Sequence, residues 1–188
     1  MDLRSVIRSL YYKWLIYKAD SYTVGKLFSK LYGIKIGENS RFTGKKISFG
    51  SEPFLIEIGD NVTITPGVKF QTHDGGVALF RKEYPGMNVY GKIKIGNNVF
   101  IGEDAMIMYG VTIGDNVVIG ARSVVTHDVA PNSLAVGVPA RVIKSLDEYR
   151  KSSLEKALFI TETNNAERKN KIITGLSAKE QVSLKNKR

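Results

Sequence analysis

The hydrophobic positions of this chain recur with a period of six between Ile95 and Ala130. Each unit begins with an aliphatic residue, followed by glycine in most units: Ile95, Ile101, Ile107, Ile113, Ile119 and Val125. A second small or branched residue stands four places later in each unit: Val99, Ala105, Val111, Val117, Ser123 and Val129. A helix has a period of about 3.6 and a simple strand a period of about two, so neither explains this pattern. The pattern predicts short strands and sharp turns stacked as a parallel β-helix.

The alternative for this repeat is a β-sandwich with regularly spaced turns. Six consecutive units in register favour the β-helix, because one rung buries its apolar side chains only against neighbouring rungs. The same rhythm begins at Ile36, weakens between Phe42 and Glu57, and returns at Ile58. We therefore expect the β-helix to cover residues 34–144, with an irregular coil before Ile58.

An insertion interrupts the repeat over residues 71–92. Ile58 and Ile95 are 37 positions apart, one more than six complete hexapeptides, so the register breaks between them. The insertion begins beside His73, one of only two histidines in the chain. Loops of this length are uncommon in compact domains and are often functional.

The repeat resembles that of the hexapeptide-repeat acyltransferases, which include galactoside, maltose, serine, streptogramin and polysaccharide acetyltransferases. The closing segment Val136-Gly137-Val138-Pro139-Ala140-Arg141-Val142-Ile143 also matches the end motif of that family. The resemblance implies an all-β fold, a left-handed parallel β-helix with three hexapeptides per coil. It also implies a homotrimer with active sites between subunits. The period alone does not show the handedness, which departs from the usual right-handed crossover.

Residues 1–33 are predicted to form a helical cap. One stripe of apolar residues has helical spacing: Leu3, Val6, Ile7, Leu10, Trp14 and Tyr17. A second short helix is expected to end at Gly33. The stripe has two interpretations. It belongs to a cap that packs on the first coil and protects its edge, or it lies on an anionic membrane, because Lys, Arg, Trp and Tyr flank it; the two interpretations are compatible.

Residues 145–188 are predicted to form a C-terminal helix and a basic tail. The helix is expected over residues 145–160, where a weak apolar face is present. Beyond Thr161 the sequence is polar, basic and poor in large apolar residues, which predicts a loosely packed or partly disordered extension.

Composition narrows the possible chemistry. The 188 residues include no cysteine, which excludes disulfides, thiolate catalysis and cysteine-based metal sites. No apolar run is long enough to span a membrane and no leader is recognisable, so we expect a cytoplasmic protein. The net charge of +10 is typical of proteins with an anionic partner such as nucleic acid, a membrane or a phosphorylated co-substrate. Nucleic acid is disfavoured, because the charge is concentrated in the tails.

Acyl transfer from a thioester needs a base for the acceptor proton and donors for the developing oxyanion. The resemblance places the catalytic base on a histidine one coil before the Ile95–Gly102 rung, and the match is His73. Asp74 is expected to orient its ring or to contact the acceptor. His127 stands where relatives usually have Lys, and the resemblance implies a neighbour of the cofactor or a surface residue instead of a base.

The resemblance also implies residues that bind acetyl-CoA as co-substrate. Ala121 matches a residue whose backbone amide contacts the pantetheine arm, and Phe100 replaces the Trp that commonly lines the slot. Thr126, Arg141 and Lys144 match positions around the phosphates and adenine, where cations suit a polyanionic ligand. No metal site is expected, because two distant histidines without cysteines do not build one.

We therefore predict a coenzyme A-dependent acetyltransferase that modifies a sugar hydroxyl, in a surface polysaccharide or its precursor. The alternatives are an N-acetyltransferase of an amino sugar or a drug-type small molecule, and a non-catalytic β-helix binding protein. The long loop after His73 argues against a protein without catalysis.

Overall fold

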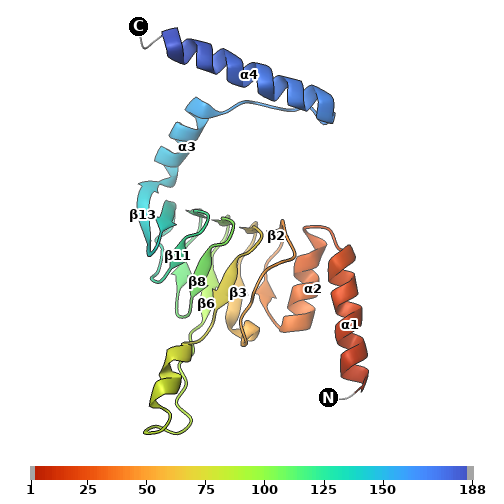
Figure 1. The fold of residues 1–188 in the computed structure, drawn as a ribbon, viewed down its shortest axis with the longest axis vertical. Helices are drawn as coiled ribbons and strands as arrows, with labels where there is room; N and C mark the ends of the chain where they lie inside the picture. The colour runs from red at the N-terminus through yellow and green to blue at the C-terminus, as the bar shows by residue number, and fades with distance from the viewer. Residues whose placement is uncertain (1–2, 186–188) are drawn as a thin grey trace. The chain divides into compact units, whose positions relative to one another are not determined.

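The computed structural model describes residues 3–185, with side chains described for Ile7 and for residues 10–179. The chain forms two compact units, Met1–Tyr149 and Arg150–Arg188 (Figure 1). The division predicted from the sequence, residues 1–33, 34–144 and 145–188, stays a prediction.

The first unit is a stack of coils whose short strands form three sheets. Sheet A contains β1 (Lys35–Ile36), β3 (Ile56–Ile58), β6 (Ile93–Ile95) and β9 (Thr112–Ile113). Sheet B contains β2 (Arg41–Phe42), β4 (Thr63–Ile64), β7 (Phe100–Ile101), β10 (Val117–Ile119), β12 (Ser133–Gly137) and β13 (Ala140–Ser145). Sheet C contains β5 (Lys69–Gln71), β8 (Met106–Met108) and β11 (Val124–Val125). The strands are parallel except for β13, which closes sheet B antiparallel to β12.

The register confirms the predicted β-helix with three hexapeptides per coil. Ile95 pairs with Ile113, and Ile107 pairs with Val125, each partner being three six-residue units further along the chain. These aliphatic residues are almost completely buried and form the continuous core. Helices occur at both ends of the chain, so the fold is a strand-rich β-helix with helices and the description as all-β is not confirmed.

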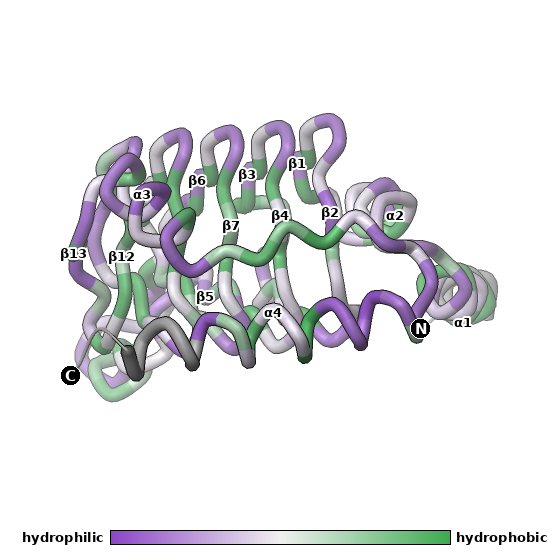
Figure 2. The backbone as a smooth tube through the Cα atoms, turned by 90° about the horizontal axis from the view of Figure 1, so that it is seen from above, coloured by the Kyte–Doolittle hydropathy of each residue, from purple (hydrophilic) through white to green (hydrophobic). Residues whose placement is uncertain are grey.

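The corners between sheets A and B are built from asparagine, aspartate and glycine. Asn98 and Asn116 have φ values of 55° and 58°, and the side-chain amide of Asn98 donates to Oδ1 of Asn116 at 3.2 Å. A Cβ atom on Gly96 would lie 2.4 Å from Oδ1 of Asp115, so only glycine fits between the stacked turns. Figure 2 shows these corners as a row of hydrophilic turns beside β1, β3 and β6.

Two helices precede the coils, as the sequence predicts. Helix α2 (Thr23–Tyr32) buries Val24 and Phe28 against the first coil and ends at Gly33, whose φ of 73° requires a left-handed conformation. Helix α1 (Leu3–Lys18) lies beyond α2, at the end of the stack (Figures 1 and 2).

The face of α1 that packs is not the predicted stripe. Ile16 and Ala19 contact the core, whereas Leu10, Trp14 and Tyr17 are exposed. The predicted packing of this stripe on the first coil is therefore wrong for its described residues. Helical spacing identifies an apolar stripe, but a different side of the chain, with Ile16 and Ala19, contacts the core. The side chains of Leu3 and Val6 lie outside the described residues.

The insertion follows sheet C. The chain leaves β5 at Gln71, forms the 3₁₀ helix η2 (Gly75–Phe80) and re-enters the coil at β6. It projects from the stack as the yellow-green segment of Figure 1. The irregular coil expected before Ile58 contains a second 3₁₀ helix, η1 (Pro53–Leu55).

The C-terminal part is more helical than the sequence indicated. Helix α3 (Leu146–Lys156) agrees with the prediction, but the expected loose tail contains a 21-residue helix, α4 (Asn165–Lys185). Oδ1 of Asn164 accepts the backbone N–H of Ala166 at 2.8 Å and caps the start of α4. Its Lys, Arg, Glu and Gln residues lower the mean hydropathy and yet favour a helix, so a low hydropathy did not indicate a disordered segment here. Within the described residues, no helix has the length and apolar character needed to cross a membrane.

Candidate active site

His73 lies at the corner where sheet C opens into the insertion. It follows β5 and pairs with Tyr90 of the returning chain in an isolated antiparallel bridge. The N–H of Gly91 donates to the carbonyl oxygen of Thr72 at 3.0 Å, and the N–H of Asp74 donates to that of Val89 at 3.0 Å. The two ends of the insertion are thus joined by backbone hydrogen bonds, which hold His73 at its base.

A carboxylate from the irregular coil contacts the ring of His73. Oε2 of Glu52 lies 2.8 Å from Nδ1 of His73, and the same oxygen accepts the hydroxyl of Thr72 at 2.7 Å. Two hydrogen bonds hold the pKa of Glu52 below its usual range: the bond from the Thr72 hydroxyl has the larger effect and the bond from His73 the smaller one. An ionised Glu52 requires the proton of the neutral ring to reside on Nδ1. That tautomer leaves Nε2, which makes no hydrogen bond to the described residues, as an acceptor.

Asp74 does not orient the imidazole of His73, which was one of its two expected roles. Its Oδ1 accepts the N–H of Gly76 at 2.8 Å and caps η2. Its Oδ2 accepts the hydroxyl of Tyr109 at 3.2 Å. The charge of Asp74 and this hydrogen bond raise the pKa of Tyr109, so the phenol stays protonated. In the structure Glu52 and not Asp74 orients the imidazole, and contact of Asp74 with an acceptor remains a prediction.

A polar cavity of about 300 Å³ opens beside His73. Seven of its lining side chains bear polar groups: Ser51, Glu52, His73, Asp74, Arg81, Asn88 and Tyr90. Nε of Arg81 donates to the carbonyl oxygen of Met87 at 3.0 Å, and its Nη2 donates to Oδ1 of Asn88 at 2.7 Å. The insertion therefore supplies a fixed set of donors and acceptors, which suits a small hydroxylated molecule.

The second histidine occupies the same corner of the prism, two coils further along. Thr126 and His127 follow β11, the strand of sheet C separated from β5 by β8. Nδ1 of His127 lies 2.8 Å from Oγ1 of Thr126, and both residues are exposed. His127 thus has a hydroxyl partner where His73 has a carboxylate, so the geometry favours His73 as the base.

The remaining predicted cofactor residues lie elsewhere on the prism. Ala121 precedes β11 and Phe100 belongs to β7 of sheet B, with 42% of Phe100 exposed. Arg141 and Lys144 are exposed on β13, at the end of sheet B. These four residues lie on sheet B or at the corner where sheet B leads into sheet C. His73 lies at the next corner of the prism, at the C-terminal ends of the strands of sheet C. One protomer therefore does not bring the two groups together.

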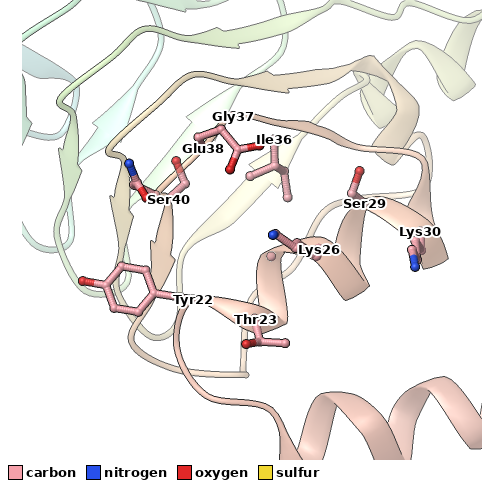
Figure 3. Close-up of a pocket in the computed structure, with 11 residues that line it drawn as sticks. Tyr22, Thr23, Lys26, Ser29, Lys30, Ile36, Gly37, Glu38 and Ser40 are labelled. Atoms are coloured by element: carbon pink, nitrogen blue, oxygen red, sulfur yellow. The ribbon is translucent and has the colours of Figure 1, made fainter.

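A separate hollow of about 620 Å³ lies between α2 and the first coil. Figure 3 shows Lys26 extending from α2 toward the side of the coil that carries Ile36 and Glu38. The hydroxyl of Ser29 already donates to Ile34 and that of Ser40 to Gly59. This hollow contains none of the predicted site residues and no histidine, so the smaller cavity beside His73 is the better candidate for catalysis.

Sequence reasoning missed Glu52 and Tyr109. Glu52 lies in the stretch where the hexapeptide rhythm fades, and its only signal was a carboxylate beside Pro53 in an irregular coil. Tyr109 stands at the third position of its unit, where the other units carry a smaller or more polar residue: Asn97, Glu103, Asp115, Ala121 and His127. Among the described residues, no group of three or more potential ligands could hold a metal ion.

Comparison with known proteins agrees with this architecture. Residues 92–127 match the family model described as bacterial transferase hexapeptide (six repeats). Protein CapG of Staphylococcus aureus is 52% identical over 138 residues, which make up 73% of this chain and 80% of CapG. A galactoside acetyltransferase solved in complex with coenzyme A is 32% identical, with a TM-score of 0.54, over 80% of this chain and 86% of that one.

A maltose O-acetyltransferase from Clostridium difficile 630 is also similar. It is 34% identical, with a TM-score of 0.51, over 77% of this chain and 89% of that one. These similarities imply that the coils wind in the left-handed sense of the hexapeptide acetyltransferases. With its six-residue register and its similarity to CapG over most of that protein, the chain belongs to the hexapeptide-repeat family of acyltransferases.

Proposed function

We propose that this protein transfers the acetyl group of acetyl-CoA to a hydroxyl group of a sugar. The observation that carries the proposal is the contact between Glu52 and His73 at the edge of a polar cavity. The related maltose and galactoside enzymes are named for acetyl transfer to sugars, and one of them was solved with coenzyme A. We extend this to a surface polysaccharide or its precursor as the acceptor.

His73 acts as a general base in the proposed reaction. Nε2 takes the proton of the acceptor hydroxyl, and the oxygen bonds to the acyl carbon as the carbon–sulfur bond breaks. The imidazolium then returns the proton to the departing thiolate. Glu52 stabilises the imidazolium between these two steps, because its carboxylate is held ionised beside Nδ1. The chain has no cysteine, so the acetyl group passes directly to the acceptor without a thioester on the protein.

The acceptor would bind in the cavity formed by the insertion. The guanidinium of Arg81, the amide of Asn88 and the carboxylate of Asp74 line it. Sugar hydroxyls both donate and accept hydrogen bonds, so a mixed lining of this kind suits them. His73 and Glu52 have side chains that are 28% and 19% exposed, which leaves the ring accessible to a substrate.

We propose a homotrimer whose sites lie between subunits. In one protomer, His73 follows the C-terminal end of β5, whereas Ala121 precedes the N-terminal end of β11. The two residues therefore lie at opposite edges of sheet C, where an edge means the row of strand ends along one corner of the prism. A three-fold arrangement of prisms lets the His73 edge of one subunit face the Ala121 edge of the next. Acetyl-CoA would then lie between the two, with its charged end near Arg141 and Lys144, while Thr126 and His127 would reach it from the His73 side. We place the reaction in the cytoplasm, where acetyl-CoA is available.

Acetyl-CoA consumption with a panel of sugars tests the proposal. We expect thiol release that depends on a sugar acceptor, with a product that hydroxylamine cleaves, because esters react under mild conditions and amides do not. A hydroxylamine-resistant product formed only from amino sugars or drug-type amines would assign N-acetylation instead. Coenzyme A binding without turnover of any acceptor in the panel would contradict the enzymatic proposal and favour a binding protein.

A further inference from the structure

Helix α1 presents an uncovered apolar face at the end of the prism. Five of its large apolar or aromatic residues are more than half exposed: Ile7, Leu10, Tyr11, Trp14 and Tyr17. Leu10 is 60% exposed and Tyr17 is 73% exposed. On the opposite side, Ile16 of α1 and Ala19, the residue after the helix, pack against the core, so α1 is fixed on the protein and its outer face remains exposed. We call these five residues the outer face of α1.

The spacing of the outer face makes it one continuous stripe. Its residues recur every three or four positions, which places them on one side of a helix over a length of about 15 Å. The rings of Tyr11 and Trp14 stack with centroids 6.5 Å apart. Trp and Tyr combine an apolar ring with a polar atom, and they concentrate where a lipid bilayer meets water.

The surroundings of the outer face are positively charged. Lys13 and Lys18 are exposed on α1, and within the described residues neither has an ion-pair partner. Nζ of Lys45, from the first coil, lies 5.3 Å from the centre of the Tyr17 ring and donates to the carbonyl oxygen of Tyr17. The sequence of α1 contains no Asp or Glu. An apolar stripe bordered by cations is the pattern of a helix that lies in an anionic membrane surface.

We propose that the outer face of α1 docks this protein on an anionic phospholipid surface. The aromatic and aliphatic side chains would enter the boundary between headgroups and acyl chains, and the lysines would contact lipid phosphates. The helix lies on the surface and does not cross it, in agreement with the absence of a membrane-spanning helix among the described residues.

A second copy of the chain fits the outer face less well. Contact between two α1 helices would bring Lys13 and Lys18 close to the lysines of the partner, with no carboxylate on either helix to neutralise them. An anionic bilayer supplies the missing negative charge. In a trimer of prisms packed side by side, three α1 helices would also share one end, which raises the effective affinity for a flat surface.

Vesicle flotation of the full chain tests the proposal independently of any activity. Vesicles of phosphatidylcholine alone are compared with vesicles of equal parts phosphatidylcholine and phosphatidylglycerol. We expect flotation with the second kind only, and loss of binding as salt is added. Leu10→Ser combined with Trp14→Ser should weaken binding at least about tenfold, because the inserted apolar area is removed. Lys13→Gln combined with Lys18→Gln should also weaken it at least about tenfold.

Matched controls distinguish binding through the outer face from nonspecific binding by other apolar or charged side chains, and from loss of binding through misfolding. Phe159→Ser removes a side chain that is 75% exposed in the other compact unit and should leave flotation unchanged. Lys94→Gln combined with Lys151→Gln removes the same charge elsewhere and should have an effect of less than about twofold. Thermal melting by circular dichroism shows whether each variant is folded.

Three results would overturn the proposal. The first is that the wild-type protein does not float with anionic vesicles at low salt. The second is that the Leu10 and Trp14 double variant binds as well as the wild type, which would assign binding to the basic C-terminal unit. The third is that this variant keeps its flotation but loses an oligomeric state in sedimentation, which would make the outer face a contact between copies.

Discussion

The Nδ1 atom of His73 lies 2.8 Å from Oε2 of Glu52, across the corner where the insertion begins. The two residues are 21 positions apart and come from neighbouring coils, one regular and one irregular. The oxygen that contacts the ring also accepts the hydroxyl of Thr72, so the carboxylate is held from two sides. This arrangement fixes one tautomer of His73 and gives the proposed base a partner for its positive charge.

Replacement of His73 should abolish most of the activity. We expect His73→Asn to lower kcat by about 10²- to 10⁴-fold, the usual contribution of a general base. Binding of acetyl-CoA should persist, because in the proposed reaction the imidazole only carries a proton from the acceptor hydroxyl to the departing thiolate and holds no other part of the coenzyme. Steady-state kinetics and calorimetric titration with coenzyme A measure the two effects.

His127→Ala is the matched control for this substitution. His127 is exposed and, in the part of the chain that the structure describes, its side chain contacts only that of Thr126, so its loss should change kcat by less than about threefold. The assignment of the two histidines would be reversed if His127→Ala abolished activity and His73→Asn kept it.

Glu52 is a positioning residue, and Glu52→Gln tests that role. The amide keeps the shape but not the charge, so we expect kcat to fall about 10- to 100-fold, as for other carboxylates that hold a functional histidine. Glu52→Asp should recover part of the rate. A lower melting temperature with unchanged kcat for Glu52→Gln would assign Glu52 a structural role only.

The coils between Ile95 and Ala130 were predictable because every rung obeys the same local rule. An aliphatic residue points inward, a second apolar residue follows four places later, and Asn or Gly forms the corner. The position of His73 at the start of the insertion followed from the break in that rhythm. None of this required knowledge of contacts between distant parts of the chain.

Glu52 was not predictable because its role depends on how one irregular coil stacks on the next. No repeat fixes the register between Phe42 and Ile56, so the sequence does not show which residue faces His73. The packed face of α1 was not predictable for a different reason. This helix carries apolar residues on two sides, and the periodicity does not indicate which side packs against the core.

Arg141 should contribute to binding of acetyl-CoA and little to chemistry. Its guanidinium is exposed and donates only to the carbonyl oxygen of Ala140 among the described residues. We expect Arg141→Ala to raise KM for acetyl-CoA about tenfold, the loss typical of one hydrogen bond between charged groups, with a smaller change in kcat. Lys94→Ala on sheet A is the control for charge alone. Equal KM values for Arg141→Ala and wild type would make Arg141 a surface residue without a ligand.

Asp20 should stabilise the start of α2 through its charge. Oδ1 of Asp20 accepts the N–H groups of Tyr22 and Thr23 at 2.8 and 2.9 Å, and Oδ2 accepts the hydroxyl of Thr23. These hydrogen bonds lower the pKa of Asp20 from 3.8 to about 2, and the bond from the backbone N–H of Thr23 has the largest effect. We expect Asp20→Ala to lower the melting temperature at neutral pH by about 2–4 °C, as for the loss of a helix cap.

The pH dependence of this effect follows from the direction of the shift. A pKa that is lower in the folded state means that the ionised form is favoured by folding, so the stabilisation is complete above pH 3.8. It is lost as pH falls toward 2. The difference in melting temperature between wild type and Asp20→Ala should therefore shrink over that range, whereas Asp20→Asn keeps an acceptor without the charge. A difference that stays constant down to pH 2 would contradict a contribution from the charge.

Mixed oligomers should recover activity from two inactive parents if each site is shared between subunits. His73→Asn removes the base at one edge of sheet C, and Ala121→Trp fills the proposed cofactor slot at the other edge. When the two variants are co-expressed with different tags and purified in sequence, random trimers contain sites in which both edges are native. Purification through both tags keeps only trimers that contain both variants. Each such trimer has one subunit boundary at which both edges are native, so about a third of the sites should be restored.

The alternative is a site contained within one subunit. In that arrangement every protomer carries one damaged edge, so no mixture of the two variants contains a native site. Mixed trimers that form, as sedimentation shows, and yet remain inactive would therefore contradict the shared site. Recovery requires that His73 and Ala121 act together across a subunit boundary, because the structure holds them at opposite edges of one sheet in each protomer.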